Sequence, residues 1–158
     1  MSGGITPERR ALIEAYRSGY AAVDVALAGI TDADLDRPAA EGGWTARDVV
    51  HHLADSETNA YIRLRRLVAE ERPEIVGYNE ELWSRRLHYD RPIGPSLAVL
   101  GAVRLASLQL LEVLTPDEWE RAGTHSERGT YAVDDWLRIY ARHSHEHAEQ
   151  IRRARAGR

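Results

Sequence analysis

Apolar residues recur at helical spacing in four long stretches of the chain. They predict helices over about Pro7–Ala28, 46–70, 95–114 and 133–155. The first stretch opens on Thr6-Pro7-Glu8, which supplies an N-cap, a proline at the first helical position and an acid in the first turn. Runs of alternating β-branched residues are missing, so we predict no strand.

Four amphipathic helices of roughly 20 residues favour an all-α four-helix bundle. We expect a single domain over residues 1–158, because this length suits one hydrophobic core. The connection over residues 72–94 is long and has few periodic apolar residues, although 80–87 has the pattern of a short helix. A connection of that length allows the second and third helices to run parallel, which predicts an up-down-down-up order.

Composition excludes several kinds of chemistry. The chain has no cysteine, so thiolate ligands, disulfides and a cysteine nucleophile are ruled out. All 21 cations are arginine, which rules out a catalytic lysine. The formal charge of -4 is mild and argues against nucleic-acid binding. We find no signal peptide and no apolar run close to the roughly 20 residues of a membrane span, so we expect a cytoplasmic protein without a membrane partner.

Three of the seven histidines fall in the run His143 to His147. On a helix, His143 and His147 are four residues apart and share a face, whereas His145 points elsewhere. At 100° per residue, His143 and His147 lie within or beside the apolar arc, and His145 lies on the polar side. Two inward imidazoles need partners, either hydrogen bonds within the core or a shared metal ion.

A third ligand is sought among the remaining histidines. His88 and His125 fall in predicted loops, and His51 and His52 fall in the helix over 46–70. His52 lies at the shoulder of that helix's apolar arc, while His51 lies almost opposite and is expected to be solvated. Three histidines from two facing helices leave a coordination position open, as in catalytic zinc-like sites; zinc and nickel suit such a set best. The predicted metal ligands are His52, His143 and His147.

Polar residues near these histidines receive no assigned catalytic role. The run His143 to His147 also matches H-x-x-E-H, the inverted zinc-peptidase motif, in which Glu146 would be the general base. Such peptidases need a further ligand well downstream and only 11 residues follow His147, so we treat the match as accidental. Four polar residues after His52 are expected on the helix surface: Asp55, Ser56, Glu57 and Asn59. Of these, Asp55 and Asn59 are candidates to contact a metal ligand from outside or to contact the substrate.

Three motifs together resemble a known family. Residues 44–57 resemble the second-helix signature of the DinB-like superfamily, a tryptophan followed by "H-[LI]-x-D-x-E". Residues 143–151 are similar to its last-helix pattern, "H-x-x-x-H-x-x-Q-I". Residues 73–83 resemble the loop "P-x-I-x-x-Y-D-E-x-x-W" of the YfiT-type branch, with Asn79 where that branch often has aspartate. The resemblance spans about residues 8–152.

The resemblance implies a four-helix bundle that holds a divalent metal through His52, His143 and His147. Members of the YfiT-type branch are described as metal-dependent hydrolases. Relatives act as bacillithiol S-transferases or as mycothiol-dependent enzymes, and homodimers are common in the superfamily.

We expect first a metal-dependent S-transferase that joins a low-molecular-weight thiol of the bacillithiol type to an electrophilic substrate. A thiol at an open metal position would be deprotonated, so the chain needs no cysteine of its own. One alternative is a hydrolase in which the metal activates water; another is a non-catalytic, metal-stabilised stress or binding protein. Two further groups each have two possible roles. The arginines of the second helix are either solvated or bind a carboxylate of the thiol: Arg63, Arg65 or Arg66. The aromatic residues of the long connection either pack together or line the substrate pocket: Tyr78 and Trp83.

Overall fold

Four long helices form the protein, for which the computed structural model describes residues 4–158, residue 41 by its backbone alone. They are α1 (Pro7–Leu27), α3 (Ala46–Ala69), α5 (Gly94–Val113) and α7 (Val133–Arg155). Each predicted helix is present within two residues of its expected ends. The first three residues of the predicted domain lie outside the described part of the chain.

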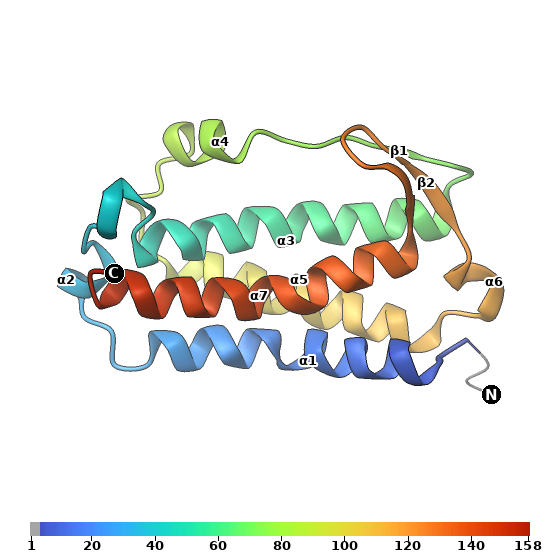
Figure 1. Ribbon diagram of the computed structural model, residues 1–158, viewed down its shortest axis with the longest axis horizontal. Helices are drawn as coiled ribbons and strands as arrows, with labels where there is room; N and C mark the ends of the chain where they lie inside the picture. The colour runs from blue at the N-terminus through green and yellow to red at the C-terminus, as the bar shows by residue number, and fades with distance from the viewer. Residues whose placement is uncertain (1–3) are drawn as a thin grey trace.

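The helices follow an up-down-down-up order, as predicted. In Figure 1, α1 and α7 run in one direction and α3 and α5 run in the other. The connection between α3 and α5 returns along the length of the bundle and carries the short helix α4 (Glu80–Arg86) beside α3. This return makes the parallel arrangement of α3 and α5 possible.

The prediction that the chain has no strand was wrong. A small three-stranded sheet contains β1 (Glu74–Ile75), β2 (Ala122–His125) and β3 (Gly129–Ala132); β1 pairs parallel to β2, and β2 pairs antiparallel to β3. Strands of two to four residues are too short to show an alternating pattern. The remaining short elements are α2 (Asp32–Leu35), the 3-10 turn η1 (Ala40–Gly42) and α6 (Pro116–Trp119).

The bundle core is divided into two apolar halves by a layer of buried polar side chains. On α3 this layer runs from His52 to Glu57, at the boundary where the apolar residues pass from the half that contains Leu53 to the half that contains Ala60. The three long polar or charged members are His52, Glu57 and Arg104, each no more than 3% exposed, and Ser144 joins them from α7. Burial of such groups is costly unless they are paired, so the layer marks the place where the core serves something other than packing.

Helix α5 differs from the other three in its exposed face. Val99, Leu105 and Val113 are exposed there. By length and composition alone α5 passes as a membrane span, contrary to the sequence-based expectation, but a core helix of a soluble protein meets the same criterion. Its central Arg104 is buried against Glu57 of α3, which identifies α5 as a bundle helix.

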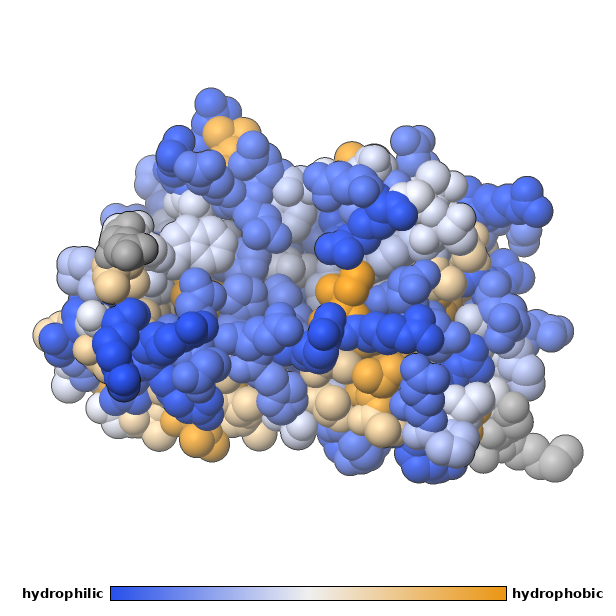
Figure 2. All heavy atoms as spheres, in the orientation of Figure 1, coloured by the Kyte–Doolittle hydropathy of each residue, from blue (hydrophilic) through white to orange (hydrophobic). Residues whose placement is uncertain are grey.

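The face drawn in Figure 2 is mainly hydrophilic, with a hydrophilic band over α7 and only small apolar spots.

Candidate metal centre

Helix α3 places His52 two turns from its start. A capping box fixes that start: Thr45 accepts from the Asp48 backbone N–H, and the Asp48 carboxylate accepts from the Thr45 N–H. His52 is 2% exposed, and the Trp44 ring packs against it with centroids 4.6 Å apart. The helix cap fixes the start of α3, and the indole covers one face of this imidazole.

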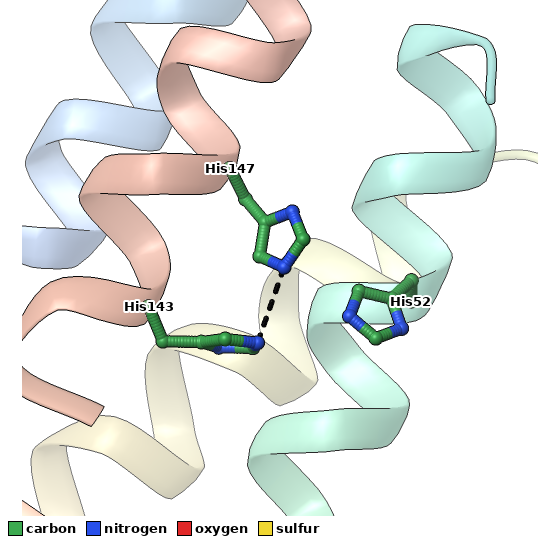
Figure 3. Close-up of side chains that lie close together, drawn as sticks. All are labelled: His52, His143 and His147. Atoms are coloured by element: carbon green, nitrogen blue, oxygen red, sulfur yellow. Dashed lines mark hydrogen bonds between the residues drawn. The ribbon is translucent and has the colours of Figure 1, made fainter. Parts of the chain in front are cut away.

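Helix α7 supplies the other two imidazoles from adjacent turns. His143 and His147 face α3, and Figure 3 shows that the three rings point toward one another across the gap between the two helices. The Nε2 atoms of His143 and His147 are 3.2 Å apart. One nitrogen from each of the three histidines lies within 4.8 Å of the others. The structure therefore brings together the three residues that the helical angles selected.

Outer partners determine which nitrogen of the two α7 rings faces the cluster. The Nδ1–H of His143 donates to Glu57 Oε1 at 3.0 Å, and the Nδ1–H of His147 donates to Gln150 Oε1 at 2.7 Å. A neutral imidazole that donates through Nδ1 carries its lone pair on Nε2. The two Nε2 atoms thus turn lone pairs toward each other, and a hydrogen bond between them would require an imidazolium.

Burial opposes such an imidazolium. Desolvation lowers the pKa of His147 to about 4, and the nearby His143 acts in the same direction. Desolvation, together with the two other imidazoles, lowers the pKa of His52 to about 3. Neutral rings with converging lone pairs are the form in which histidine binds metals.

The geometry fits a divalent metal ion. Tetrahedral ligation at about 2.05 Å requires nitrogen atoms roughly 3.4 Å apart, and the His143–His147 pair already has this spacing. His52 needs to approach by at most about 1.5 Å, which is within the reach of a side-chain rotation. The cluster is a three-histidine site that can hold a metal ion and leaves coordination positions free.

Glu57 is the residue of this site that sequence reasoning missed. It was expected on the helix surface, yet its side chain is 0% exposed and it binds both His143 and Arg104. Burial alone would raise the pKa of Glu57, but Arg104 and the His143 hydrogen bond outweigh burial and lower it. At 100° per residue from Val49, Glu57 falls near 80°, inside the apolar arc of α3, so the angles that selected His52 could have found it.

The remaining histidines lie apart from the cluster. The prediction that His51 is solvated was wrong: it is buried, donates through Nε2 to the Arg91 carbonyl and accepts at Nδ1 from the Ser96 hydroxyl. The end of the α3–α5 connection covers this face of α3, which the pattern of α3 alone does not reveal. His145 is half-buried against the Ala15 carbonyl of α1.

The two histidines that were predicted in loops differ from each other. His125 is not in a loop but buried in β2, whereas His88 is exposed in the connection before α5.

The other polar residues of α3 near the cluster are engaged within the protein. Asp55 accepts from the Tyr89 hydroxyl at 2.7 Å, and Asn59 bonds back to its own helix. Arg63 donates to the Tyr140 hydroxyl and to the Val76 carbonyl. Arg65 and Arg66 also donate to protein groups. All three arginines thus make contacts within the protein, whereas the sequence left open whether they are solvated or meet a carboxylate of the thiol.

Cavities and aromatic rings flank the cluster. His147 lines a cavity of about 400 Å³ together with Trp44 and Gln150. Tyr78 and Trp83 of the α3–α5 connection pack together, with ring centroids 4.4 Å apart and ring planes tilted by 48°. Trp83 also lines a second cavity of about 300 Å³ over α3. Ser56, whose hydroxyl is 3.5 Å from His143 Nε2, completes the polar side of the cluster.

A bundle in this helix order, with three imidazoles converging between its second and last long helices, defines a class of helical metal-site protein. The family model described as the DinB superfamily matches residues 15–151. The chain belongs to the DinB superfamily, and its similarities place it in the YfiT-like branch.

Individual relatives agree with this assignment. A protein from Oceanobacillus iheyensis is 39% identical over 122 residues, covering 77% of this chain and 71% of the relative. YfiT from Bacillus subtilis is 39% identical over 125 residues, covering 77% and 70%. Both are named, provisionally, as metal-dependent hydrolases. The solved structure of YfiT, described as a probable metal-dependent hydrolase with an unusual four-helix bundle topology, matches with a TM-score of 0.85 at 35% identity, over 93% of this chain and 86% of that one.

Proposed function

We propose that this protein is a metal-dependent hydrolase in which His52, His143 and His147 hold one divalent ion. The observation that carries the proposal is the convergence of three imidazole nitrogens, two of which have their protons directed away from the centre by Glu57 and Gln150. The names of the relatives support hydrolysis over the thiol transfer that the sequence first suggested.

When bound, such an ion supplies Lewis acidity, which lowers the pKa of water and polarises a carbonyl or phosphoryl group. The protein's own residues orient the ligands and restrict the approach of solvent. Trp44 covers one face of His52, and the Tyr140 ring packs edge-on against His143. Aromatic cover of this kind lowers the local dielectric and strengthens every polar contact at the centre.

Tyr78 is the residue that we assign to the substrate. Its hydroxyl is buried and has no hydrogen-bond partner among residues 4–158. The side chain lies close to Ser56, and burial raises its pKa, so the phenol stays protonated. A buried O–H without a partner is costly, and a substrate oxygen at the metal centre offers it an acceptor.

The experiment is a reconstitution assay. The metal-free protein is loaded with zinc, nickel, cobalt or manganese and assayed with nitrophenyl esters, anilides and phosphates, with and without added thiols. We expect metal-dependent hydrolysis in the absence of thiol. A rate that requires both a thiol and an electrophile such as a chloronitrobenzene would instead favour the transferase.

No turnover under any condition, with metal bound, would favour the non-catalytic reading. The small-molecule substrate and the homodimer belong to the same proposal, and the resemblance is their support.

A further inference from the structure

Glu57 is a buried carboxylate that no packing argument explains. Its side chain is 0% exposed and lies in the polar layer that divides the apolar core. An apolar residue would fill this position at lower cost, because a charge in a protein interior is costly unless it is paired. The contacts of Glu57 therefore indicate what it serves.

One oxygen of Glu57 receives three donors. Arg104 Nη1 donates to Oε1 at 2.6 Å, His143 Nδ1 at 3.0 Å and the Ser144 hydroxyl at 3.4 Å. The other oxygen has no partner among the described residues. Arg104 is itself fixed by the Tyr16 carbonyl of α1 at 2.5 Å. The carboxylate is thus held through Oε1, which faces the Nδ1 side of the His143 ring.

The three histidines of the cluster differ in what stands behind them. His143 has the carboxylate of Glu57, His147 has the neutral amide of Gln150, and His52 Nδ1 is buried without a hydrogen-bond partner in the described chain. A charged acceptor behind an imidazole fixes its tautomer and raises its basicity, more than a neutral amide does.

We propose that Glu57 is a positioning residue of the metal centre: it locks His143 in the form that presents Nε2 and makes His143 the strongest of the three ligands, while Arg104 keeps the carboxylate in place. This inference rests on the proposed function only in that a metal binds at the cluster, and it holds for any reaction performed there. Glu57 does not itself reach the metal position, since the His143 ring lies between them.

The test measures metal affinity and the coordination spectrum. Glu57→Gln retains an acceptor oxygen but removes the charge, and we expect it to weaken Zn²⁺ binding 10–100-fold in competition with a chromogenic chelator. The visible absorption of the Co²⁺-loaded protein should shift as well, because the donor strength of His143 changes. Gln150→Leu, which removes the neutral partner of His147, should weaken binding less than Glu57→Gln.

A second variant separates loss of the Glu57 contact from misfolding, because Glu57→Gln alone leaves Arg104 buried without its counter-ion. The double variant Glu57→Gln with Arg104→Met removes both charges, and we expect the same loss of affinity and the same spectral shift. Leu111→Ala is the matched control: Leu111 of α5 is fully buried in the apolar half of the core that contains Leu64 and Leu67, so the variant destabilises the bundle without removing a contact of the histidine cluster.

Wild-type affinity and an unchanged Co²⁺ spectrum in both Glu57 variants would overturn the inference. An equal loss in Leu111→Ala would also overturn it, because the effect would then reflect stability alone. If the wild-type protein itself binds no metal, the proposed function fails, which is a separate result from either of these.

Discussion

At the scale of the residue, the positions of the imidazole ring protons decide whether the histidine cluster can bind a metal ion. The imidazoles of His143 and His147 use one nitrogen for a partner within the protein and keep the other for the centre. The low pKa values of His52 and His147 mean that no proton must leave these two rings before a metal binds at neutral pH. The arrangement is preorganised for a cation.

His147→Ala should lose the bound metal and the hydrolytic rate together. Removal of a ligand costs more than the roughly 10–100-fold loss of affinity typical of an outer partner, so we expect no metal to remain after gel filtration. Elemental analysis of the purified variant measures this. The matched control is His145→Ala, which removes only the contact of His145 with α1 and should keep its full metal content. Retention of metal by His147→Ala would refute the ligand assignment.

Tyr78→Phe separates a functional hydroxyl from a structural one. Because the Tyr78 hydroxyl has no partner in the described chain, its removal should leave the free energy of unfolding within about 0.5 kcal/mol of wild type or raise it. If the hydroxyl binds substrate, kcat falls while metal content stays constant. Chemical denaturation and steady-state kinetics on one preparation give both values. A large loss of stability would show that the hydroxyl serves the fold.

Most of the metal cluster could be predicted from the sequence, because the ligands lie on long helices whose angular pattern is unambiguous. His52, His143 and His147 were selected on this basis. His51 was misjudged because the segment that buries it comes from the α3–α5 connection, which has no periodicity of its own. Glu57 lies inside the apolar arc, but an acid after a histidine on a helix was taken for a surface residue.

At the scale of the element, the small sheet anchors the connection that covers α3. Strand β1 begins this segment, and the Thr124 backbone N–H donates to the Pro73 carbonyl. A Cβ added to Gly123 would lie 2.2 Å from that carbonyl oxygen, so the close approach requires glycine. The position of Tyr78 and Trp83 thus depends on a contact made more than 40 residues later in the chain. Neither this contact nor the strands had a detectable pattern in the sequence, whereas the helix ends had caps.

Gly123→Ala should force β1 away from β2. The clash is with backbone, and we expect a loss of about 1–3 kcal/mol in the free energy of unfolding, typical of overpacking. Limited trypsin digestion should then cleave within residues 72–94, at Arg85 or Arg86. Thr124→Ala, an exposed change on the same strand, should behave as wild type. An unchanged cleavage pattern in Gly123→Ala would show that the connection is held by other contacts.

At the scale of the whole molecule, metal and fold are linked. The ligands come from α3 and α7, which are separated along the chain by α4, α5, α6 and the three strands, so a bound ion ties together the ends of a long chain segment. Binding to the folded state alone stabilises it by mass action. The helix order itself was predictable, because the length of the α3–α5 connection permits a parallel pair.

Metal removal should lower the melting temperature. At a free metal concentration 100 times the Kd, stabilisation is about 2.7 kcal/mol, which for a chain of this size corresponds to roughly 5–10 °C. Thermal denaturation with zinc and then with a chelator measures the difference. His52→Ala should show no difference between the two conditions. A melting temperature that is insensitive to metal in the wild type would mean that the cluster is not a binding site.

The buried Arg104–Glu57 pair has a consequence for the route by which the protein folds and unfolds. Arg104 bridges α5 to Glu57 of α3, to the Tyr16 carbonyl of α1 and to the Tyr140 carbonyl of α7, contacts separated by 47, 88 and 36 residues. All of them exist together only once the four helices have docked, so we expect them to form after the folding transition state. Interactions that form this late slow unfolding and leave the folding rate nearly unchanged. A metal ion bound by His143, whose ring is hydrogen-bonded to Glu57 of this pair, should therefore prolong the lifetime of the native protein without speeding its folding.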